Sequence, residues 1–301
     1  MNTIKNLNTM LVCLDLTDID QALIRYASFL SQALETNKII FIHAIQAYDL
    51  PDKTSKKFPD LRSSLSTTIE EEINSVVSNH FKKQIKTEVV TKIEDEDASE
   101  VIIDFIEKEK VDLTLVGQKY GEDREGHYGQ RIAEQAQSDL MFVPEDPVDS
   151  LERILCAVDF SEASEKAFLR ALEISRKAES RLTCHYIYDT SKSYFPASTL
   201  KTTSYIEKQF NKRFKKFLKK FDLKPEDVNC KFDVDDSLTS QAEKTYRTAK
   251  EEESQLVIIG AKGKTTSVTT LLGNITENLR RMDKEIPVMI MKNLKKKRKW
   301  V

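Results

Sequence analysis

Glycine is scarce in this chain: there are 7 glycines among 301 residues, whereas average usage is about 7%. Most turns must therefore be made by other residues. Three of the seven, Gly260, Gly263 and Gly273, nevertheless fall within one stretch of fourteen residues, and residues 151–301 contain no other glycine. This concentration favours a specific role for the stretch over ordinary turns, which need glycine only for positive φ angles.

Long apolar runs are missing as well. No run approaches the roughly 18 residues of a membrane span, and the apolar stretch in MNTIKNLNTMLVCLDL is too short and too soon interrupted for a secretory signal. The four cysteines form no CxxC pair, and Cys13, Cys156 and Cys184 lie in strand-like apolar runs. We therefore expect a cytoplasmic protein with reduced, mostly buried thiols and no attachment to a membrane.

Several catalytic signatures are also absent. HExxH and Cys/His ligand spacings are missing, so no metal site is predicted, and without GxSxG a nucleophile-elbow hydrolase has little support. The segment GAKGKTT looks like part of a Walker loop, but Ile258 stands where that loop needs its first glycine. No GxGxxG follows a first strand, so a nicotinamide site of that type is not supported.

What the chain does contain suits a globular protein, because 40% of its residues are hydrophobic and 32% are charged. Its length predicts two domains, each able to bury a core. Residues 1–150 hold 16 basic and 28 acidic side chains, a net charge of −12, and residues 151–301 hold 31 and 21, a net charge of +10. The basic half can attract phosphates, and the opposite charges can help the halves dock. The simpler alternative is that the charges of two solvent-exposed surfaces have diverged without a functional reason.

The two halves repeat one pattern at offsets of 142 to 147 residues. MLVCLDL resembles RILCAVDF, KIIFIHAI resembles RLTCHYIY, VDLTLVGQKYG resembles SQLVIIGAKGK, and DLMFVPED resembles PVMIMKN. The polar linker EDPVDSLER separates the copies. The repeat predicts one domain over residues 1–147, a second over residues 151–294, and a basic tail over residues 295–301.

Inside each copy, short β-branched runs alternate with segments of helical period, so that each reads β-α-β-α-β-α-β-α-β. Continuous apolar strands such as residues 256–259 suit a parallel sheet covered on both faces. Right-handed crossovers then give an α/β fold with two tandem, doubly wound, five-stranded parallel sheets of the Rossmann or flavodoxin-like type. A ligand site is expected at the carboxyl ends of the strands, near the switch in strand order.

The glycine-containing stretch begins at that edge. Gly260 follows the strand LVII, and the pattern G-x2-G-x9-G-N leads into the helical segment ITENLRR. Bare backbone amides can approach a phosphate closely, and a helix N-terminus adds unpaired N–H donors. Lys262 and Lys264, with hydroxyls at residues 265–267, suit a polyphosphate. Tight turns with positive φ are the alternative explanation.

With these segments the chain resembles the universal stress protein family, over nearly all of both halves. The residues that carry the resemblance are AVDFSEAS at a strand end, the strand LTCHYIY, and GAKG followed nine residues later by GNITENL. Gly-x2-Gly-x9-Gly before a small polar residue is the nucleotide signature of the family's ATP-binding branch. The resemblance implies an adenine-nucleotide-binding fold in which ATP, with or without Mg²⁺, lies across the carboxyl ends of five parallel strands.

The same resemblance implies the nucleotide-binding residues of the C-terminal copy. Asp159 would bind the ribose or the adenine edge, the backbone of Tyr186 would meet the adenine ring, and the end of the strand at residues 259–260 would flank the ribose and α-phosphate. Amides further along the glycine stretch would meet the phosphates. The family usually has Ser or Thr where this chain has Asn274, which still offers its backbone N–H and its amide. The full set is Ala157, Asp159, Tyr186, Ile259, Gly260, Lys262, Gly263, Gly273, Asn274 and Ile275.

The N-terminal copy is predicted to have lost this site. Asp15 and Gly117 match residues of the site, but Tyr120 stands where Gly263 would be required. Three carboxylates would lie where a polyanion would bind, those of Glu122, Asp123 and Glu125. Repulsion between like charges about 4 Å apart reaches about 4 kcal/mol near a protein surface. This repulsion exceeds the roughly 0.3–1 kcal/mol by which a helix N-terminus attracts a negative charge. One nucleotide site per chain is therefore expected.

Other segments have plainer explanations. FNKRFKKFLKKF predicts a helix with a Phe face on the sheet and a solvated basic face, with binding to an anionic membrane or nucleic acid as the alternative. EDEDASE predicts a helix start, and the tail MKNLKKKRKW predicts a solvated end, with contact to an acidic partner as the alternative. His43 and His185 occupy equivalent strand positions and are expected to be structural.

The last strands of the two copies, DLMFV and PVMIM, are expected to pair within the chain, as domains of the family commonly do. Such pairing would cover a sheet edge that is otherwise exposed. The chain would then form an intramolecular pseudo-dimer, and further homodimerisation stays open.

The resemblance and the residues together predict a stress-response protein that binds ATP in its C-terminal half and acts as a nucleotide-dependent switch for a regulatory protein partner. No residue set supplies an evident general base, so hydrolysis is expected to be slow or absent. Two alternatives stay open: a weak ATPase or self-phosphorylating protein with Thr265, Thr266 or Ser267 as acceptor, and an interaction module without nucleotide. No nucleic-acid partner is expected.

Overall fold

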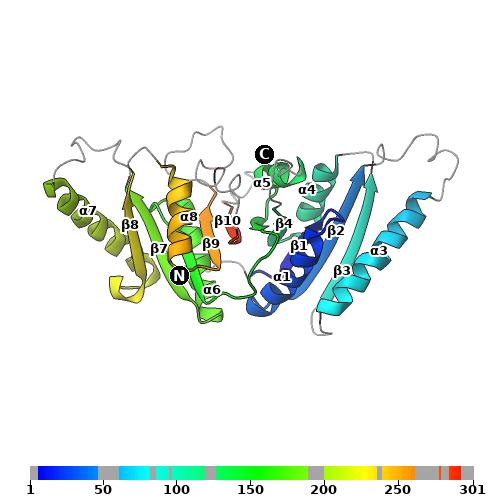
Figure 1. Cartoon of the computed structure of the whole chain (residues 1–301), viewed down its shortest axis with the longest axis horizontal. Coiled ribbons are helices and arrows are strands. Elements are labelled where there is room, and N and C mark those ends of the chain that lie inside the picture. Colours follow the sequence, from blue (N-terminus) through cyan, green and yellow to red (C-terminus); the bar gives the residue numbers. More distant parts are fainter. Residues whose placement is uncertain are drawn as a thin grey trace, which may run out of the picture. The chain divides into compact units, whose positions relative to one another are not determined.

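The computed structural model describes most of the chain, and Figure 1 shows the elements that it forms. These residues divide into two compact units, one built mainly from Asn6–Asp149 and one that begins at Ser150. The predicted pairing of the two last strands stays a prediction. The described ranges are 6–46, 61–81, 86–94, 97–118, 127–188, 200–235, 239–261, 278 and 285–292.

The N-terminal unit alternates strands and helices, as the repeat predicts. Its strands all pair in parallel, in the order β3-β2-β1-β4-β5. The elements are β1 (Thr9–Leu14), α1 (Ile19–Ala33), β2 (Lys38–Gln46), α3 (Leu61–His80), β3 (Lys86–Glu94), α4 (Ala98–Glu109), β4 (Leu113–Gly117), α5 (His127–Gln135) and β5 (Asp139–Val143).

The C-terminal unit repeats this topology, with the parallel order β10-β9-β6-β7-β8. The prediction of a doubly wound parallel sheet in each half is therefore confirmed. The segment ITENLRR lies outside the described residues apart from position 278. The elements are β6 (Arg153–Ala157), α6 (Glu162–Lys177), β7 (Arg181–Tyr188), α7 (Leu200–Leu218), the short helices η3 (Lys219–Phe221) and η4 (Pro225–Asp227), β8 (Asn229–Val234), α8 (Gln241–Glu251), β9 (Leu256–Gly260) and β10 (Val288–Met291).

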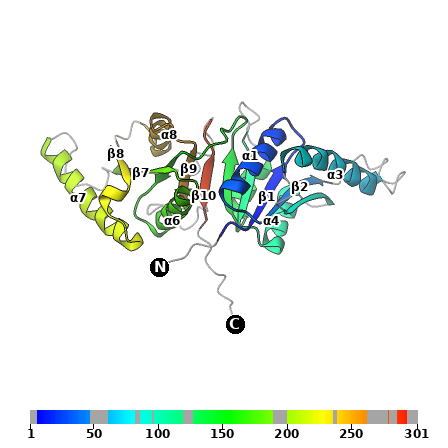
Figure 2. The ribbon, with the colours of Figure 1, turned by 90° about the horizontal axis from the view of Figure 1, so that it is seen from below.

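Helices cover both faces of each sheet; Figure 2 shows α6 and α8 on opposite faces of the C-terminal sheet. The central strands are buried on both faces, which explains why a sequence such as LVII in β9 is continuously apolar. The outermost strand β8 is only partly buried along its length. The repeated apolar strands thus form the core of each unit, and the helix pattern covers it.

Turns in this protein are made with little help from glycine. Seven described residues other than glycine have a positive φ angle: Leu16, Glu35, Lys110, Phe160, Glu179, Asp222 and Glu253. The left-handed region costs such residues about 1–2 kcal/mol each. In contrast, none of the described glycines, at positions 117, 129 and 260, has a φ angle in the left-handed range. Among the described glycines, Gly117 and Gly260 therefore allow close packing and do not serve left-handed turns.

Helix α7 confirms the prediction of a Phe face on the sheet and a basic face in solvent. Its buried residues share one side, and burial of each such side chain stabilises the unit by roughly 1.5–3 kcal/mol: Ile206, Phe210, Phe214, Phe217 and Leu218. The acidic segment before α4 also behaves as predicted, because the Asp97 carboxylate accepts a hydrogen bond from the Ser99 backbone N–H at 2.9 Å and caps the helix. In the parts of the chain described, no helix combines the length and apolar character needed to cross a bilayer.

Candidate functional site

Five of the ten predicted site residues are described, and they lie at the carboxyl ends of three neighbouring strands. Ala157 ends β6 and Asp159 follows it, Tyr186 lies near the end of β7, and Ile259 and Gly260 end β9. Because β6 pairs with β7 on one side and with β9 on the other, the strand order switches at this place. The other five predicted residues lie outside the described residues: Lys262, Gly263, Gly273, Asn274 and Ile275.

Gly260 is required by the packing of α6 against β9. A Cβ atom at this position would lie 2.7 Å from the carbonyl carbon of Ala163 and 2.9 Å from its Cβ, in the first turn of α6. The explanation by a left-handed turn is wrong for this glycine, since its φ angle lies outside the left-handed range. The missing side chain allows the start of α6 to approach the strand end, a reason that the sequence pattern did not indicate.

Asp159 is held at the junction between β6 and α6. Its Oδ1 atom accepts a hydrogen bond from the Ser161 backbone N–H at 2.9 Å. The Ser161 hydroxyl oxygen in turn accepts from the Ser164 backbone N–H at 3.2 Å, which caps α6. The carboxylate of Asp159 is half-buried. A negatively charged acceptor is thus fixed at the strand end, beside the first turn of the helix.

An aromatic cluster supports the turn that follows Asp159. Phe160 has a φ angle of 61°, and its ring stacks on Tyr186 with centroids 4.8 Å apart and an interplanar angle of 23°. The Arg213 guanidinium lies 5.0 Å from the centroid of the Phe160 ring, and its Nη1 donates a hydrogen bond to the Tyr186 hydroxyl oxygen at 3.2 Å. Burial raises the pKa of Tyr186, and nearby Arg213 opposes this effect. The side chain of Tyr186 is therefore committed to the cluster.

Sequence reasoning missed the roles of Phe160 and Arg213 in this cluster. It grouped Arg213 with the basic face of α7, because the segment NKRFKK gives no sign that one cation turns toward the sheet. The segment FSE after Asp159 likewise gives no sign that the Phe160 ring stacks on the next strand. Only the parallel register, which sets Ala157 beside His185, brings the two rings together.

The equivalent place in the N-terminal unit is built differently. Here the Asp20 carboxylate accepts from the Leu16 backbone N–H at 2.8 Å and from the Asp15 N–H at 3.2 Å. Two carboxylates, those of Asp15 and Asp20, therefore lie together at the end of β1. Leu16 replaces the aromatic ring and is 45% exposed. The residues predicted to block phosphate in this half, Tyr120, Glu122, Asp123 and Glu125, lie outside the described residues.

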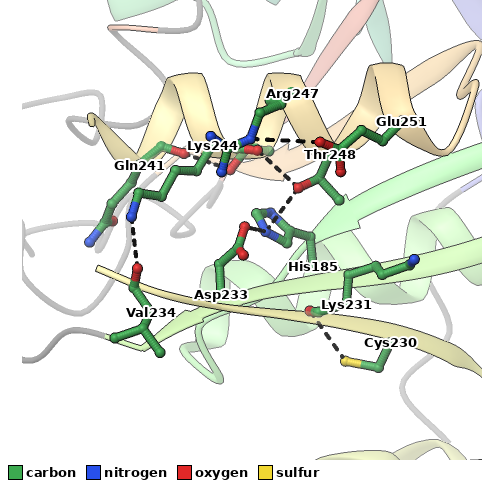
Figure 3. A network of polar contacts seen from close by, with 11 residues as sticks. His185, Cys230, Lys231, Asp233, Val234, Gln241, Lys244, Arg247, Thr248 and Glu251 are labelled. Atoms are coloured by element: carbon green, nitrogen blue, oxygen red, sulfur yellow. Dashed lines mark hydrogen bonds and ion pairs between the residues drawn. The ribbon is translucent and has the colours of Figure 1, made fainter. Parts of the chain in front are cut away.

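The two strand histidines are both buried, but their hydrogen bonding differs. His43 Nδ1 lies 3.0 Å from the Leu14 carbonyl oxygen, as expected of a structural histidine. His185 Nε2 lies 3.1 Å from Asp233 Oδ2 and 3.4 Å from Thr248 Oγ1, as Figure 3 shows. The Nδ1 atom of His185 is buried without a partner. The prediction of a structural histidine therefore holds for His43, whereas His185 is satisfied at one nitrogen only.

The geometry around His185 selects its neutral form. The Thr248 hydroxyl donates to the Lys244 carbonyl oxygen at 3.0 Å, so that its oxygen accepts from the Nε2–H of His185. A second proton would lie on the buried Nδ1, which has no acceptor. Burial accordingly lowers the pKa of His185, although Asp233 opposes the shift. Besides Asp233, two charged groups on α8 act on the pKa of the ring: Arg247 lowers it and Glu251 raises it.

We expect the C-terminal unit to lose stability as the pH falls below about 6.5, the pKa of an unfolded histidine. Below this pH the histidine is protonated in the unfolded chain, whereas the buried His185 of the folded protein stays neutral. The free energy of unfolding therefore falls by up to about 1.4 kcal/mol per pH unit. His185→Gln should flatten this slope between about pH 7 and pH 5 in urea unfolding. His80→Gln, at the end of α3, is the control and should keep the wild-type slope. Equal slopes for wild type and His185→Gln would contradict the assignment.

The cysteines do not form a reactive centre. All four lie in strands, and Cys156, Cys184 and Cys230 are neighbours across three paired strands. They are free thiols, two of them buried and two half-buried. Burial raises the pKa of Cys13 and of Cys230 to about 12 and also raises those of the other two. They therefore stay protonated near neutral pH, where a thiol is a poor nucleophile and metal ligand.

The arrangement of the acidic, histidine and cysteine side chains gives no candidate metal site among the described residues. Within the described ranges, no three His, Cys, Asp or Glu side chains are gathered in a way that could hold a metal ion.

Comparison with known proteins gives a family and a fold. Two stretches, residues 6–144 and residues 150–292, match the profile described as the Universal stress protein family. A universal stress protein from Archaeoglobus fulgidus DSM 4304 matches with a TM-score of 0.61 and 16% identity, over 95% of this chain and 96% of that chain. A putative universal stress protein from Pseudomonas aeruginosa UCBPP-PA14 matches with a TM-score of 0.65 and 12% identity, over 95% and 93%. No curated protein matches the chain. At these identities the solved structures are evidence for the duplicated fold alone.

Proposed function

The chain belongs to the universal stress protein family, with two domains of that family in tandem, and from this premise we propose that it is a regulatory protein that binds ATP. The proposed site is single and lies in the C-terminal half. It comprises Asp159, the backbone near Tyr186, the end of β9 at Ile259 and Gly260, and the glycine stretch that continues from there.

The observation that carries this proposal is the meeting of two chain segments at the switch point. Cys156 of β6 is in register with Ile258 of β9, so that Asp159 and Gly260 leave the sheet side by side. Asp159 places a carboxylate there, which can accept hydrogen bonds from ribose hydroxyls or from an adenine amino group. Gly260 begins the stretch whose later glycines would present bare amides to phosphates.

The contrast between the halves supports a single site. The N-terminal strand end carries Asp20 in addition to Asp15, and the Asp20 carboxylate occupies the backbone N–H groups of residues 15 and 16. Those donors are therefore already used, and a second negative charge opposes a phosphate. In the C-terminal half, Ser164 stands at the place of Asp20 and bonds to the Ser161 carbonyl oxygen instead.

Calorimetric titration with ATP is expected to give one site per chain. Asp159→Asn keeps an oxygen that can accept from the Ser161 N–H but removes the charge, and it should weaken ATP binding about tenfold, since a hydrogen bond to a charged acceptor contributes about 1.5–3 kcal/mol. Asp15→Asn is the matched control and should leave the affinity unchanged. Two comparable sites, or a loss with Asp15→Asn alone, would overturn the placement of the site.

We propose a regulatory role because a nucleotide bound at the strand end would favour whichever conformation of the protein binds it more tightly. A protein partner that distinguishes the conformations would then respond to the nucleotide. Turnover is expected to be slow: purified protein incubated with radiolabelled ATP should release little phosphate, whereas rapid release would favour an enzyme. No change in melting temperature with millimolar ATP would favour an interaction module without nucleotide.

A further inference from the structure

The ring of His185 is enclosed between β7, β8 and α8 of the C-terminal unit (Figure 3). Only 1% of the residue is exposed, and both partners of the ring, Asp233 and Thr248, contact the same nitrogen, Nε2. A proton added to the ring would lie on Nδ1, which is buried without an acceptor. Because a buried donor without a partner is costly, the ring can take up a proton only when its contact with α8 opens and admits water.

In the described part of the chain, the charged groups around this ring come from β8 and α8. On β8, the Asp233 carboxylate favours a positive ring, and its side chain is 35% exposed. On α8, Glu251 acts in the same direction and Arg247 acts against it. None of these groups accepts a hydrogen bond from Nδ1, so that proton uptake still requires the contact to open. Two lysines are held by other groups: Lys231, in register with His185 and 2.7 Å from a Glu252 carboxylate oxygen, and Lys244, whose Nζ donates to the Val234 carbonyl oxygen at 2.7 Å.

The backbone of His185 fixes the two strand ends from which the proposed nucleotide site takes its groups. Its carbonyl oxygen accepts a hydrogen bond from the Val158 backbone N–H at 2.9 Å. Val158 immediately precedes Asp159, and Tyr186 immediately follows His185. A movement that frees the ring from α8 therefore disturbs the ends of β6 and β7, which would hold ATP.

The equivalent histidine of the N-terminal unit lacks these contacts. His43 lies against a backbone carbonyl oxygen instead of a carboxylate. The strand register puts Ile93 at the place of Asp233. Counting from the helix caps puts Phe105 at the place of Thr248. The contacts of the ring with β8 and α8 are therefore not required by the repeated fold.

We propose that protonation of His185 and ATP binding exclude each other in the C-terminal unit. The inference rests on the ATP site proposed above and adds its regulation. Acid opens the contact between the ring and α8 and displaces the strand ends from the nucleotide, whereas bound ATP keeps the contact closed. The effect is mutual, because the proton binds the open form and ATP prefers the closed form. The nucleotide site then responds to acidity as well as to the concentration of ATP.

Hydrogen–deuterium exchange of the full chain measures the opening of α8 directly. An accessible histidine titrates near pH 6.5, so lowering the pH from about 7.5 to about 5.5 should raise the opening constant of the α8 amides about tenfold, after correction for intrinsic exchange. ATP at about 100 times its Kd should lower this constant about a hundredfold. The amides of the central strand β9 report global unfolding and should exchange more slowly than those of α8.

Two variants assign the response to this residue. His185→Gln has no titrating ring and should lose the response of α8 to pH while the response to ATP persists. His43→Gln, at the equivalent position of the other unit, is the matched control and should keep both responses. The wild type tests the assignment even if His185→Gln does not fold, because its opening constant should be flat above about pH 7 and rise about tenfold per pH unit below about pH 6.

The proposal is overturned by a pH response that survives His185→Gln or by α8 amides that exchange no faster than those of β9. A wild-type opening constant that is unchanged by pH also overturns it. Calorimetric titration of the wild type with ATP separates the coupling from the proposed function. ATP that binds without slowing the exchange of α8 overturns the coupling alone, whereas ATP that does not bind overturns both.

Discussion

Replacing Gly260 with alanine is expected to destabilise the C-terminal unit by about 2–3 kcal/mol, as overpacking of a tight contact does. The added Cβ would lie 2.7 Å from the carbonyl carbon of Ala163 and 2.8 Å from its carbonyl oxygen. Backbone atoms at a helix start cannot rotate aside, so the first turn of α6 must move away from β9. Urea unfolding without nucleotide measures the loss and keeps it separate from any effect on ligand binding.

Gly117→Ala is the matched control, because Gly117 ends the equivalent strand β4 of the other unit. There the three atoms nearest to a Cβ would all belong to side chains, at 2.9 and 3.1 Å on Ile19 and 3.2 Å on Leu23. The ends of these side chains can shift by a few tenths of an ångström, so we expect a loss below about 1 kcal/mol. Each variant is compared with the wild-type transition of its own unit. Equal losses at the two positions would show that the backbone contact is not what makes Gly260 necessary.

The sequence predicts the fold well because its strongest signals are local and are repeated. Runs such as LVII are long enough to indicate buried parallel strands, and their recurrence in the same order indicates the topology. The Phe spacing of α7 likewise indicates its buried side, since the helical period alone decides which residues share a face. These features need no knowledge of which distant segments are neighbours.

The candidate site is predicted less completely because its details depend on distant neighbours. Gly260 is visible in the sequence, but its contact with Ala163, nearly a hundred residues earlier, is not. The same holds for Arg213 over the Phe160 ring and for the unpartnered nitrogen of His185. The phosphate side of the site, from Lys262 to Ile275, stays a prediction from the glycine spacing and the family resemblance.

Phe160→Ala is expected to destabilise the C-terminal unit by about 2–3 kcal/mol. The ring is half-buried and contacts Tyr186, Phe210 and Phe217, so the loss should be below the roughly 3–5 kcal/mol of a fully buried Phe. Leu16→Ala is the matched control. Leu16 has nearly the same backbone conformation, with a φ angle of 60°, but is 45% exposed, and its loss should stay below about 1 kcal/mol.

The backbone at Phe160 gives this prediction a second, independent readout. Relative to alanine, glycine at position 160 stabilises the folded state by about 1–2 kcal/mol, because it adopts the left-handed conformation without strain. It loses about 0.5–1 kcal/mol of this gain because its unfolded chain is more flexible. Phe160→Gly should therefore be no less stable than Phe160→Ala, the reverse of the usual order. Because Asp159 is the preceding residue, either variant should also make the position of the Asp159 carboxylate less fixed and so weaken ATP binding. An unchanged ATP affinity in a folded Phe160→Ala protein would mean that the aromatic cluster supports the fold alone and not the nucleotide site.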